Sequence, residues 1–247
     1  MREEEEDMLY VVGIGPGGAL YRTKEAQQAL EESGCIAGYT VYAELIREEF
    51  PGKEWYTTPM TKERERCIWA LEQAAAGKKA AVICSGDAGV YGMASLVLEL
   101  AEAYPEVEVR VIAGVSAAFA GGALLGAPLS HDFAVISLSD RLTEWEVIGK
   151  RLRAAARAGF PIALYNPGGR ARADYLRKAC DILLEDLSGD TVCGVAEQIG
   201  REGECERILT LRELRELVPN MFMTVFIGNS TTRVIEGRMV TPRGYRL

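Results

Sequence analysis

Residues 8–17, MLYVVGIGPG, decide how the chain folds, because an apolar run is followed at once by a glycine-rich turn. The apolar part, residues 8–12, predicts a buried first strand. Residues 22–34 then predict a helix with apolar residues on one face, charges on the other and a glycine at its end. A glycine-rich turn after a strand exposes backbone N–H groups and lets a ligand approach the main chain. The turn therefore predicts a bound small molecule, and a tight turn without a ligand is the alternative.

A dinucleotide is the first candidate ligand. Gly13, Gly15 and Gly18 satisfy the pattern G-x-G-x-x-G, which is a weak signal in a glycine-rich chain. Pro16 removes one N–H and fixes φ inside the turn that would hold a pyrophosphate. The predicted second strand, Cys35–Tyr39, lacks the acidic residue that binds a ribose. Both details argue against NAD.

Size and charge are those of an acidic globular protein. With 247 residues, 48% of them hydrophobic and 26% charged, the chain is long enough for one large or two medium domains. No apolar run approaches the roughly 20 residues that span a bilayer. The acidic residues 3–7 are the opposite of a signal peptide's basic start, so we expect a cytoplasmic protein without a membrane partner. A net charge of −8 argues against general nucleic-acid binding.

The cysteines and the histidine exclude some classes of chemistry. The six cysteines form neither a C-x-x-C pair nor a Cys/His cluster, so we expect no metal site. A Ser-His-Asp hydrolase would need the only histidine, His131, together with a G-x-S-x-G elbow that the sequence lacks.

Short apolar runs alternate with amphipathic segments along the chain, which predicts an α/β fold whose first sheet is mainly parallel. A boundary is expected at residues 126–129, giving an N-terminal α/β domain, residues 1–128, a C-terminal α/β domain, residues 129–247, and an interdomain cleft. The predicted strands are 8–12, 35–38, 79–84, 107–112, 133–137, 161–165, 191–196, 207–209 and 224–227, with a closing hairpin at 234–240. The predicted helices are 22–34, 63–76, 93–104, 115–125, 144–158, 171–185 and 211–217.

Three loops rich in small residues follow predicted strand ends, at 13–18, 85–92 and 113–118. Parallel sheets bind ligands beyond the carboxyl ends of their strands, so we expect the three loops to share one ligand. Within them, Asp87 either caps a helix or engages the ligand, Tyr91 is either a core aromatic or a ligand wall, and Ser116 is either an N-cap or a ligand contact.

Two polar sites lie in the second half of the chain. His131 and Asp132 form either a structural pair or a proton-transfer site, because a histidine changes charge near pH 6.5. Arg170 and Arg172 follow a predicted strand end, where they either bind carboxylate or phosphate groups or belong to a solvated helix face.

Short motifs occur in order along the chain: 13–17 GIGPG, 65–67 ERC, 85–94 SGDAGVYGMA, 124–129 LLGAPL, 131–133 HDF, 137–140 SLSD, 165–167 YNP, 228–230 GNS and 241–245 TPRGY. Taken together, these motifs resemble the tetrapyrrole methylase superfamily, and most closely its members that methylate C17 of precorrin-3B or its cobalt counterpart. The chain departs from those members at Arg141, Glu144 and the pair Gly168–Gly169, all of which lie outside the three small-residue loops of the first domain.

The resemblance implies an S-adenosylmethionine-dependent enzyme that does not use the Rossmann methyltransferase fold and holds its cofactor in the interdomain cleft. The cofactor-binding residues it implies are Gly15, Pro16, Gly17, Gly86, Asp87, Ala88, Tyr91, Ser116, Ala117, Asn166 and Thr224.

The implied activity is methylation of C17 together with contraction of the ring, in the biosynthesis of cobalamin. Contraction needs proton movement, for which His131 or Asp140 would serve. Carboxylates of the substrate would meet Arg141, Arg151, Arg170 and Arg172. The resemblance also implies a homodimer. A sister methylase that acts at another ring position, an NAD-dependent oxidoreductase and a non-catalytic ligand-binding module remain alternatives, and the sequence does not decide whether the substrate carries cobalt.

Overall fold

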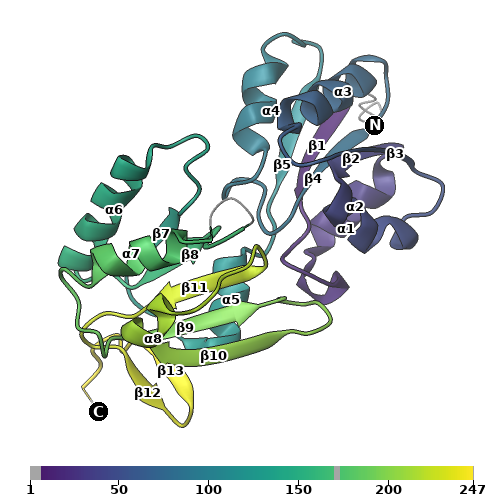
Figure 1. Cartoon of the computed structure of the whole chain (residues 1–247). Helices are drawn as coiled ribbons and strands as arrows, with labels where there is room; N and C mark the ends of the chain where they lie inside the picture. Colours follow the sequence, from purple (N-terminus) through teal and green to yellow (C-terminus); the bar gives the residue numbers. More distant parts are fainter. Residues whose placement is uncertain (1–6, 170–172, 247) are drawn as a thin grey trace. The chain divides into compact units, whose positions relative to one another are not determined.

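The computed structural model describes residues 7–169 and 173–246 and divides into two compact units, Met1–Ser116 and Ala117–Leu247 (Figure 1). The division comes earlier in the chain than the boundary expected at Pro128. Helix α5, Ala117–Leu125, packs on strands of the second unit, and β6, Gly126–Ala127, pairs with β13, Arg238–Val240. The apolar helix before the expected boundary therefore belongs to the core of the second unit.

The first unit contains a five-stranded, fully parallel sheet in the order β3-β2-β4-β1-β5. Strand β4 lies between β1 and β2, whereas a dinucleotide-binding sheet places its first two strands side by side. The order of the strands therefore argues against the NAD hypothesis. The strands are β1 Met8–Gly13, β2 Cys35–Tyr39, β3 Glu54–Thr58, β4 Ala80–Cys84 and β5 Glu108–Ile112.

Helices cover both faces of this sheet, so its central strands are apolar on both sides. Along β1, Leu9 and Val11 pack against residues of α3 and α4, whereas Met8, Tyr10 and Val12 pack with residues of α1 and α2. This arrangement explains why the opening strand is an unbroken apolar run. The helices are α1 Lys24–Glu32, α2 Thr40–Ile46, α3 Glu63–Ala75 and α4 Ala94–Ala101, with 3₁₀ turns η1 Ala19–Tyr21 and η2 Arg47–Glu49.

The second unit contains a five-stranded mixed sheet in the order β10-β9-β11-β8-β7. Strands and helices still alternate from β7 to β9, but only β7 and β8 run parallel and the other neighbours are antiparallel, so the fully parallel arrangement of the first sheet does not continue. A short sheet of β12, β13 and β6 adds the expected hairpin. The strands are β7 Ala134–Ser137, β8 Ile162–Tyr165, β9 Val192–Glu197, β10 Cys205–Thr210, β11 Met223–Ile227, β12 Arg233–Ile235 and β13 Arg238–Val240.

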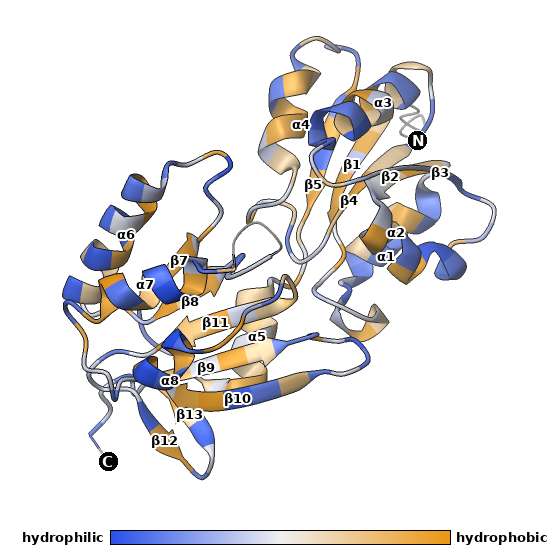
Figure 2. Cartoon of the chain, in the orientation of Figure 1, coloured by the Kyte–Doolittle hydropathy of each residue, from blue (hydrophilic) through white to orange (hydrophobic). Residues whose placement is uncertain are grey.

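The second sheet also has two covered faces. Alternate residues of β11, such as Val225, belong to the apolar core formed with α6, α7 and α8, while Phe226 faces α5, where Gly121 lets the helix approach. Figure 2 shows the strands β8, β9 and β11 largely hydrophobic and much of α6 and α7 hydrophilic. The helices are α6 Trp145–Arg157, α7 Tyr175–Leu183 and α8 Leu211–Arg215.

Most predicted elements are confirmed within a few residues. Among the described residues, α2, β3, the two-residue β6 and the 3₁₀ turns η1 and η2 have no predicted counterpart. Edge strand β3, Glu54–Thr58, is half-buried and aromatic, which makes its pattern less regular than that of the central strands. Within the described residues, no helix is both long and apolar enough to cross a bilayer.

Candidate functional site

Three loops of the first unit meet at the carboxyl edge of its sheet, as the sequence predicts. Strands β4, β1 and β5 are neighbours and run parallel, so the loops that follow them leave the sheet side by side. The first two are joined by an isolated bridge in which the N–H of Gly15 donates to the Gly86 carbonyl (3.1 Å) and the N–H of Gly86 donates to the Gly15 carbonyl (2.8 Å). We call these segments, residues 13–18, 85–93 and 113–116, the three-loop edge.

The glycines of the three-loop edge are required by contacts between the loops. A Cβ on Gly114 would lie 2.2 Å from the Gly86 carbonyl oxygen, and one on Gly13 would lie 2.7 Å from the Gly114 nitrogen. Neither distance is possible for a real side chain, so the three backbones touch one another directly. The sequence prediction located these glycines correctly, but it attributed them to close approach by a ligand.

Asp87 connects two of the loops with its carboxylate. Oδ1 accepts hydrogen bonds from the N–H groups of Gly89 (2.8 Å) and Val90 (3.2 Å), and Oδ2 accepts one from Gly114 (2.9 Å). The following helix α4 has Met93 at its N-cap, so Asp87 does not cap it. The carboxylate instead holds the three-loop edge in one conformation.

Tyr91 lies on the turn that Asp87 closes. It adopts φ = +56°, a conformation that non-glycine residues rarely hold unless the surroundings enforce it, and it is 55% exposed. The core alternative is therefore wrong. Ala88, in the same loop, is fully buried in the core.

The remaining predicted positions of the first unit are Pro16, Gly17 and Ser116, all of them buried. Gly15 has φ = +79°, and a Cβ there would lie 2.6 Å from the Tyr21 carbonyl oxygen. The turn is thus folded back against the 3₁₀ turn η1, which separates it from α1.

Arg22 anchors the chain just beyond this turn and was not identified from the sequence. Its side chain is 1% exposed and donates two hydrogen bonds to the carboxylate of Glu49 (2.9 and 3.0 Å) and one to Gln27 (2.6 Å). The guanidinium also lies 5.2 Å from the centre of the Phe50 ring. Local sequence carries no signal for this anchor, because Glu49 and Phe50 are far from Arg22 along the chain.

The second unit gathers another set of predicted residues at the carboxyl ends of β7 and β8. Asn166 follows β8 with φ = +55°, and its Nδ2 donates to the hydroxyl of Ser137 at the end of β7 (2.9 Å). The Tyr165 hydroxyl accepts the N–H of Ala118, the neighbour of Ala117 at the start of α5 (2.8 Å). We call this the β7–β8 edge.

Thr224 reaches the β7–β8 edge from the antiparallel strand β11. Its neighbour Val225 pairs with Leu164, which precedes Tyr165, so Thr224 lies level with the end of β8. Its side chain is on the α5 side of the sheet and is 4% exposed.

Asp140 lies on the loop that leaves β7, where the Tyr175 hydroxyl donates to its carboxylate. This hydrogen bond is the main cause that raises the pKa of Tyr175 above its usual value. Arg141 and Arg151 are exposed and form no ion pair with any residue that the structure describes. Arg170 and Arg172 lie outside the described residues.

His131 lies before the amino end of β7, whereas Asp140 lies beyond its carboxyl end. Strand β7, whose four residues extend for about 13 Å at 3.3 Å per residue, lies between the two positions along the chain. The ring of His131 is exposed, and its Nδ1 accepts the backbone N–H of Asp132 (2.8 Å).

Two buried thiols of the first unit, Cys84 and Cys67, contribute no nucleophile to the three-loop edge. Burial raises the pKa of Cys84, which ends β4, to about 11 and that of Cys67 to about 12, so both stay protonated at neutral pH. Among the described residues, no three His, Cys, Asp or Glu side chains gather as a metal site would require.

Comparison with known proteins shows which family shares this sequence and architecture. The profile of the family Tetrapyrrole (Corrin/Porphyrin) Methylases matches residues 8–215. A relative from Salmonella typhimurium LT2, described as a probable cobalt-factor III C(17)-methyltransferase, is 46% identical over 97% of this chain and 100% of its own length. The crystal structure of the methyltransferase CobJ superposes with a TM-score of 0.87 at 35% identity, covering 95% of this chain and 99% of that one.

A more distant solved structure shares the fold. Uroporphyrin-III C-methyl transferase from Thermus thermophilus, complexed with S-adenosyl homocysteine, superposes with a TM-score of 0.72 at 21% identity, covering 90% of this chain and 97% of that one.

Proposed function

The chain belongs to the tetrapyrrole (corrin/porphyrin) methylases, and from that premise we propose that it is the S-adenosylmethionine-dependent enzyme that methylates C17 of a cobalamin precursor and contracts its ring. The precursor is precorrin-3B or its cobalt-containing counterpart. The observation that carries the proposal is the three-loop edge, locked by the Gly15–Gly86 bridge and by Asp87. The near full-length similarity to a C(17)-methyltransferase selects the reaction within the family.

The chemistry of the loops fits a cationic nucleoside. Residues 13–18, 85–93 and 113–116 contain one carboxylate, Asp87, and no lysine or arginine. A pyrophosphate would be repelled by that charge, whereas a sulfonium is attracted by it. A cationic donor therefore suits these loops better than NAD does.

S-Adenosylmethionine, when bound, supplies a methyl group that is already activated on its sulfonium. The task left to the protein is orientation, which can contribute several kcal/mol when the reacting groups are held in line. We assign this task in the first unit to the backbones of Gly15–Gly17, Gly86–Ala88 and Ser116 and to Tyr91. In the second unit we assign it to Ala117, Asn166 and Thr224.

Ring contraction requires a group that moves a proton. We propose Asp140 ahead of His131, because Asp140 lies beyond the carboxyl end of β7, where Ser137 accepts a hydrogen bond from Asn166 at the end of β8. The Tyr175 hydroxyl holds the Asp140 carboxylate in place and orients its second oxygen.

The proposed substrate carries several carboxylate groups, so exposed arginines suit its recognition. Arg141 and Arg151 are the candidates within the described residues, and Arg170 and Arg172 are proposed from the sequence alone. We also propose a cytoplasmic homodimer, which size-exclusion chromatography with light scattering would test.

The deciding experiment measures binding first and product second. Isothermal titration calorimetry should show that the purified protein binds S-adenosylmethionine but not NAD. Incubation with ¹³C-methyl donor and either precorrin-3B or its cobalt form should add one labelled methyl group, which carbon NMR locates at C17. A methyl group on another ring carbon would identify a sister methylase, and binding without transfer would identify a ligand-binding module.

A further inference from the structure

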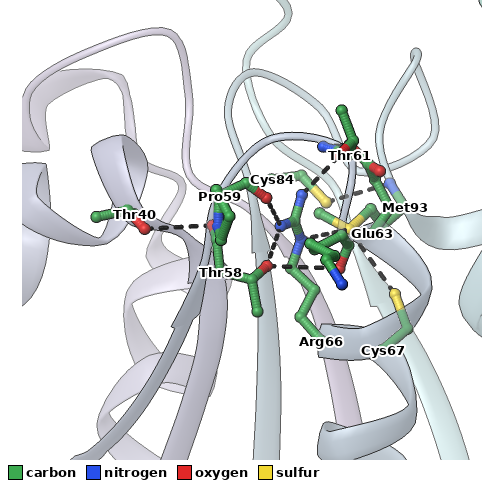
Figure 3. A network of polar contacts seen from close by, with 10 residues as sticks. Thr40, Thr58, Pro59, Thr61, Glu63, Arg66, Cys67, Cys84 and Met93 are labelled. Carbon is green, nitrogen blue, oxygen red and sulfur yellow. Dashed lines mark hydrogen bonds and ion pairs between the residues drawn. The ribbon is translucent and has the colours of Figure 1, made fainter.

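We infer that Arg66 is a positioning residue for the loop 85–93, acting through Met93 on the segment that carries Tyr91. Arg66 lies on α3 and reaches toward the ends of β3 and β4, where Met93, Thr58 and Glu63 surround its guanidinium (Figure 3). The inference deepens the proposed function, because it assigns to Arg66 control over the affinity of the proposed cofactor.

The guanidinium connects two loops at the carboxyl edge of the first sheet. Nε donates to the thioether sulfur of Met93 (3.4 Å), at the end of the loop 85–93. Nη1 donates to the hydroxyl of Thr58 and to the carbonyl of Pro59 (3.3 Å), where β3 ends, and Nη2 lies 3.6 Å from Oε1 of Glu63. Arg66 thus ties the end of the loop to the rigid end of a strand.

Met93 is held from three sides. Besides the contact from Arg66, its own N–H donates to the sulfur of Cys84 (3.3 Å), and the thiol of Cys67 donates to its sulfur (3.7 Å). Thioether and thiol sulfurs are weak hydrogen-bond partners, so the position of Met93 depends on several contacts acting together.

Core stability does not account for an arginine at this position. The Arg66 side chain is 3% exposed and follows the buried face of α3, whose other members are Cys67, Ala70, Leu71 and Ala74. Burying a charge costs free energy unless it is paired, and a well-packed apolar residue is often equally stable there. The arginine is therefore better explained by what it connects, which is Met93 on the loop and the Thr58–Pro59 end of β3.

Two side chains, Asp87 and Arg66, therefore hold the loop 85–93 at its two ends, and each acts as a tether. Asp87 fixes its beginning through Gly89, Val90 and Gly114, and Arg66 fixes its end through Met93. Tyr91 lies between the tethers in a conformation that needs external support. Loosening the second tether should free Tyr91 while the sheet stays intact.

The test compares Arg66→Met, Arg66→Lys and Met93→Leu, with Arg110→Met as the control. Arg110, on β5 of the same unit, pairs with Glu25 on the surface. Hydrogen exchange should show faster exchange of the amides of residues 88–93 in Arg66→Met, but not in the control. This readout needs no cofactor, so it decides the inference even if the protein does not bind S-adenosylmethionine and the proposed function fails.

Binding and kinetics complete the test. Arg66→Met should raise the Kd and KM for S-adenosylmethionine about tenfold and change kcat much less, and Arg66→Lys should recover part of that loss. Met93→Leu keeps a similar apolar volume but loses the sulfur, so it should weaken binding in the same direction, and the double variant should bind no worse than Arg66→Met alone. Unchanged exchange and unchanged Kd in a folded Arg66→Met or Arg66→Lys protein would overturn the inference.

Discussion

The candidate edges of the two units are held together by different chemical groups. In the first unit, main-chain atoms of neighbouring glycine loops hydrogen-bond and touch one another, and one carboxylate, Asp87, joins two loops. In the second unit, side chains make the contacts: the Tyr165 hydroxyl, the Asn166 amide and the Ser137 hydroxyl. The difference teaches that the first edge tolerates almost no added atom at its glycines, whereas the second edge can lose a contact and keep its shape.

The largest effect is expected for Gly114→Ala. Its new Cβ would lie 2.2 Å from the Gly86 carbonyl oxygen, and backbone cannot move aside as a flexible side chain does. We expect unfolding free energy to fall by about 3 kcal/mol, and binding of S-adenosylmethionine to be lost. Urea denaturation and calorimetry measure the two losses.

Gly89→Ala is the matched control in a neighbouring loop. A Cβ there would lie 3.3 Å from Oδ1 of Asp87, a contact that a small shift relieves. If Gly114→Ala were as stable as Gly89→Ala, the direct backbone contact among the three loops would be wrong.

Substitutions of Asp87 are expected to cause the next largest loss of stability. Asp87→Ala leaves three backbone N–H groups without their acceptor, and we expect a loss of about 2–3 kcal/mol. Asp87→Asn can still accept from Gly89 and Val90, but its amide nitrogen then faces the N–H of Gly114. We therefore expect about half the loss, measured by thermal unfolding, with weaker cofactor binding in both variants. Equal stability of the wild type and Asp87→Ala would show that the carboxylate does not hold the loops.

Local sequence was sufficient to predict those parts of the fold and of the candidate site that depend on neighbours along the chain. The apolar run of β1, the helical spacing in residues 22–34 and the three glycine loops are local patterns, and each is confirmed. Because the carboxyl ends of parallel strands share one edge, the grouping of the loops also followed.

Long-range pairing was not predictable in the same way. Periodicity does not record that β4 lies between β1 and β2, or that β11 runs antiparallel to β8. The same limit applies to side chains, because Arg22 meets Glu49 and Arg66 meets Thr58 only after the chain folds. In the second unit, Asn166 and Thr224 are predicted as cofactor contacts through the family resemblance and not through any local pattern, and they stay predictions.

Both units contain buried thiols, and these are expected to have a moderate effect on how stability depends on pH. Burial raises the pKa of Cys67 in the first unit and of Cys180 in the second from 9.0 to about 12. Above pH 9 the unfolded thiol loses its proton while the folded one keeps it, so stability falls as pH rises toward 12. Each thiol contributes a slope of at most about 1.4 kcal/mol per pH unit.

Alanine variants separate this contribution from other titrations. Between pH 8 and 10.5, the urea-derived stability of Cys67→Ala and Cys180→Ala should decline less steeply than that of the wild type. Cys205→Ala, which removes an exposed thiol, is the matched control. A flatter slope in one unit only would mean that the two cores do not shield their thiols equally.

Substitutions of Asn166 are expected to have the smallest effect on stability. They also test directly how the β7–β8 edge binds a ligand. Its φ of +55° favours glycine over alanine by about 1 kcal/mol, so Asn166→Gly should be more stable than Asn166→Ala by that amount in urea denaturation. Both variants lose the amide that donates to Ser137, and both lose it for any ligand. If the amide contacts S-adenosylmethionine, both should bind it equally weakly, despite their different stabilities. If Asn166→Gly instead binds as the wild type does and Asn166→Ala does not, the backbone turn is what matters, and the β7–β8 edge works as the three-loop edge does, through its main chain.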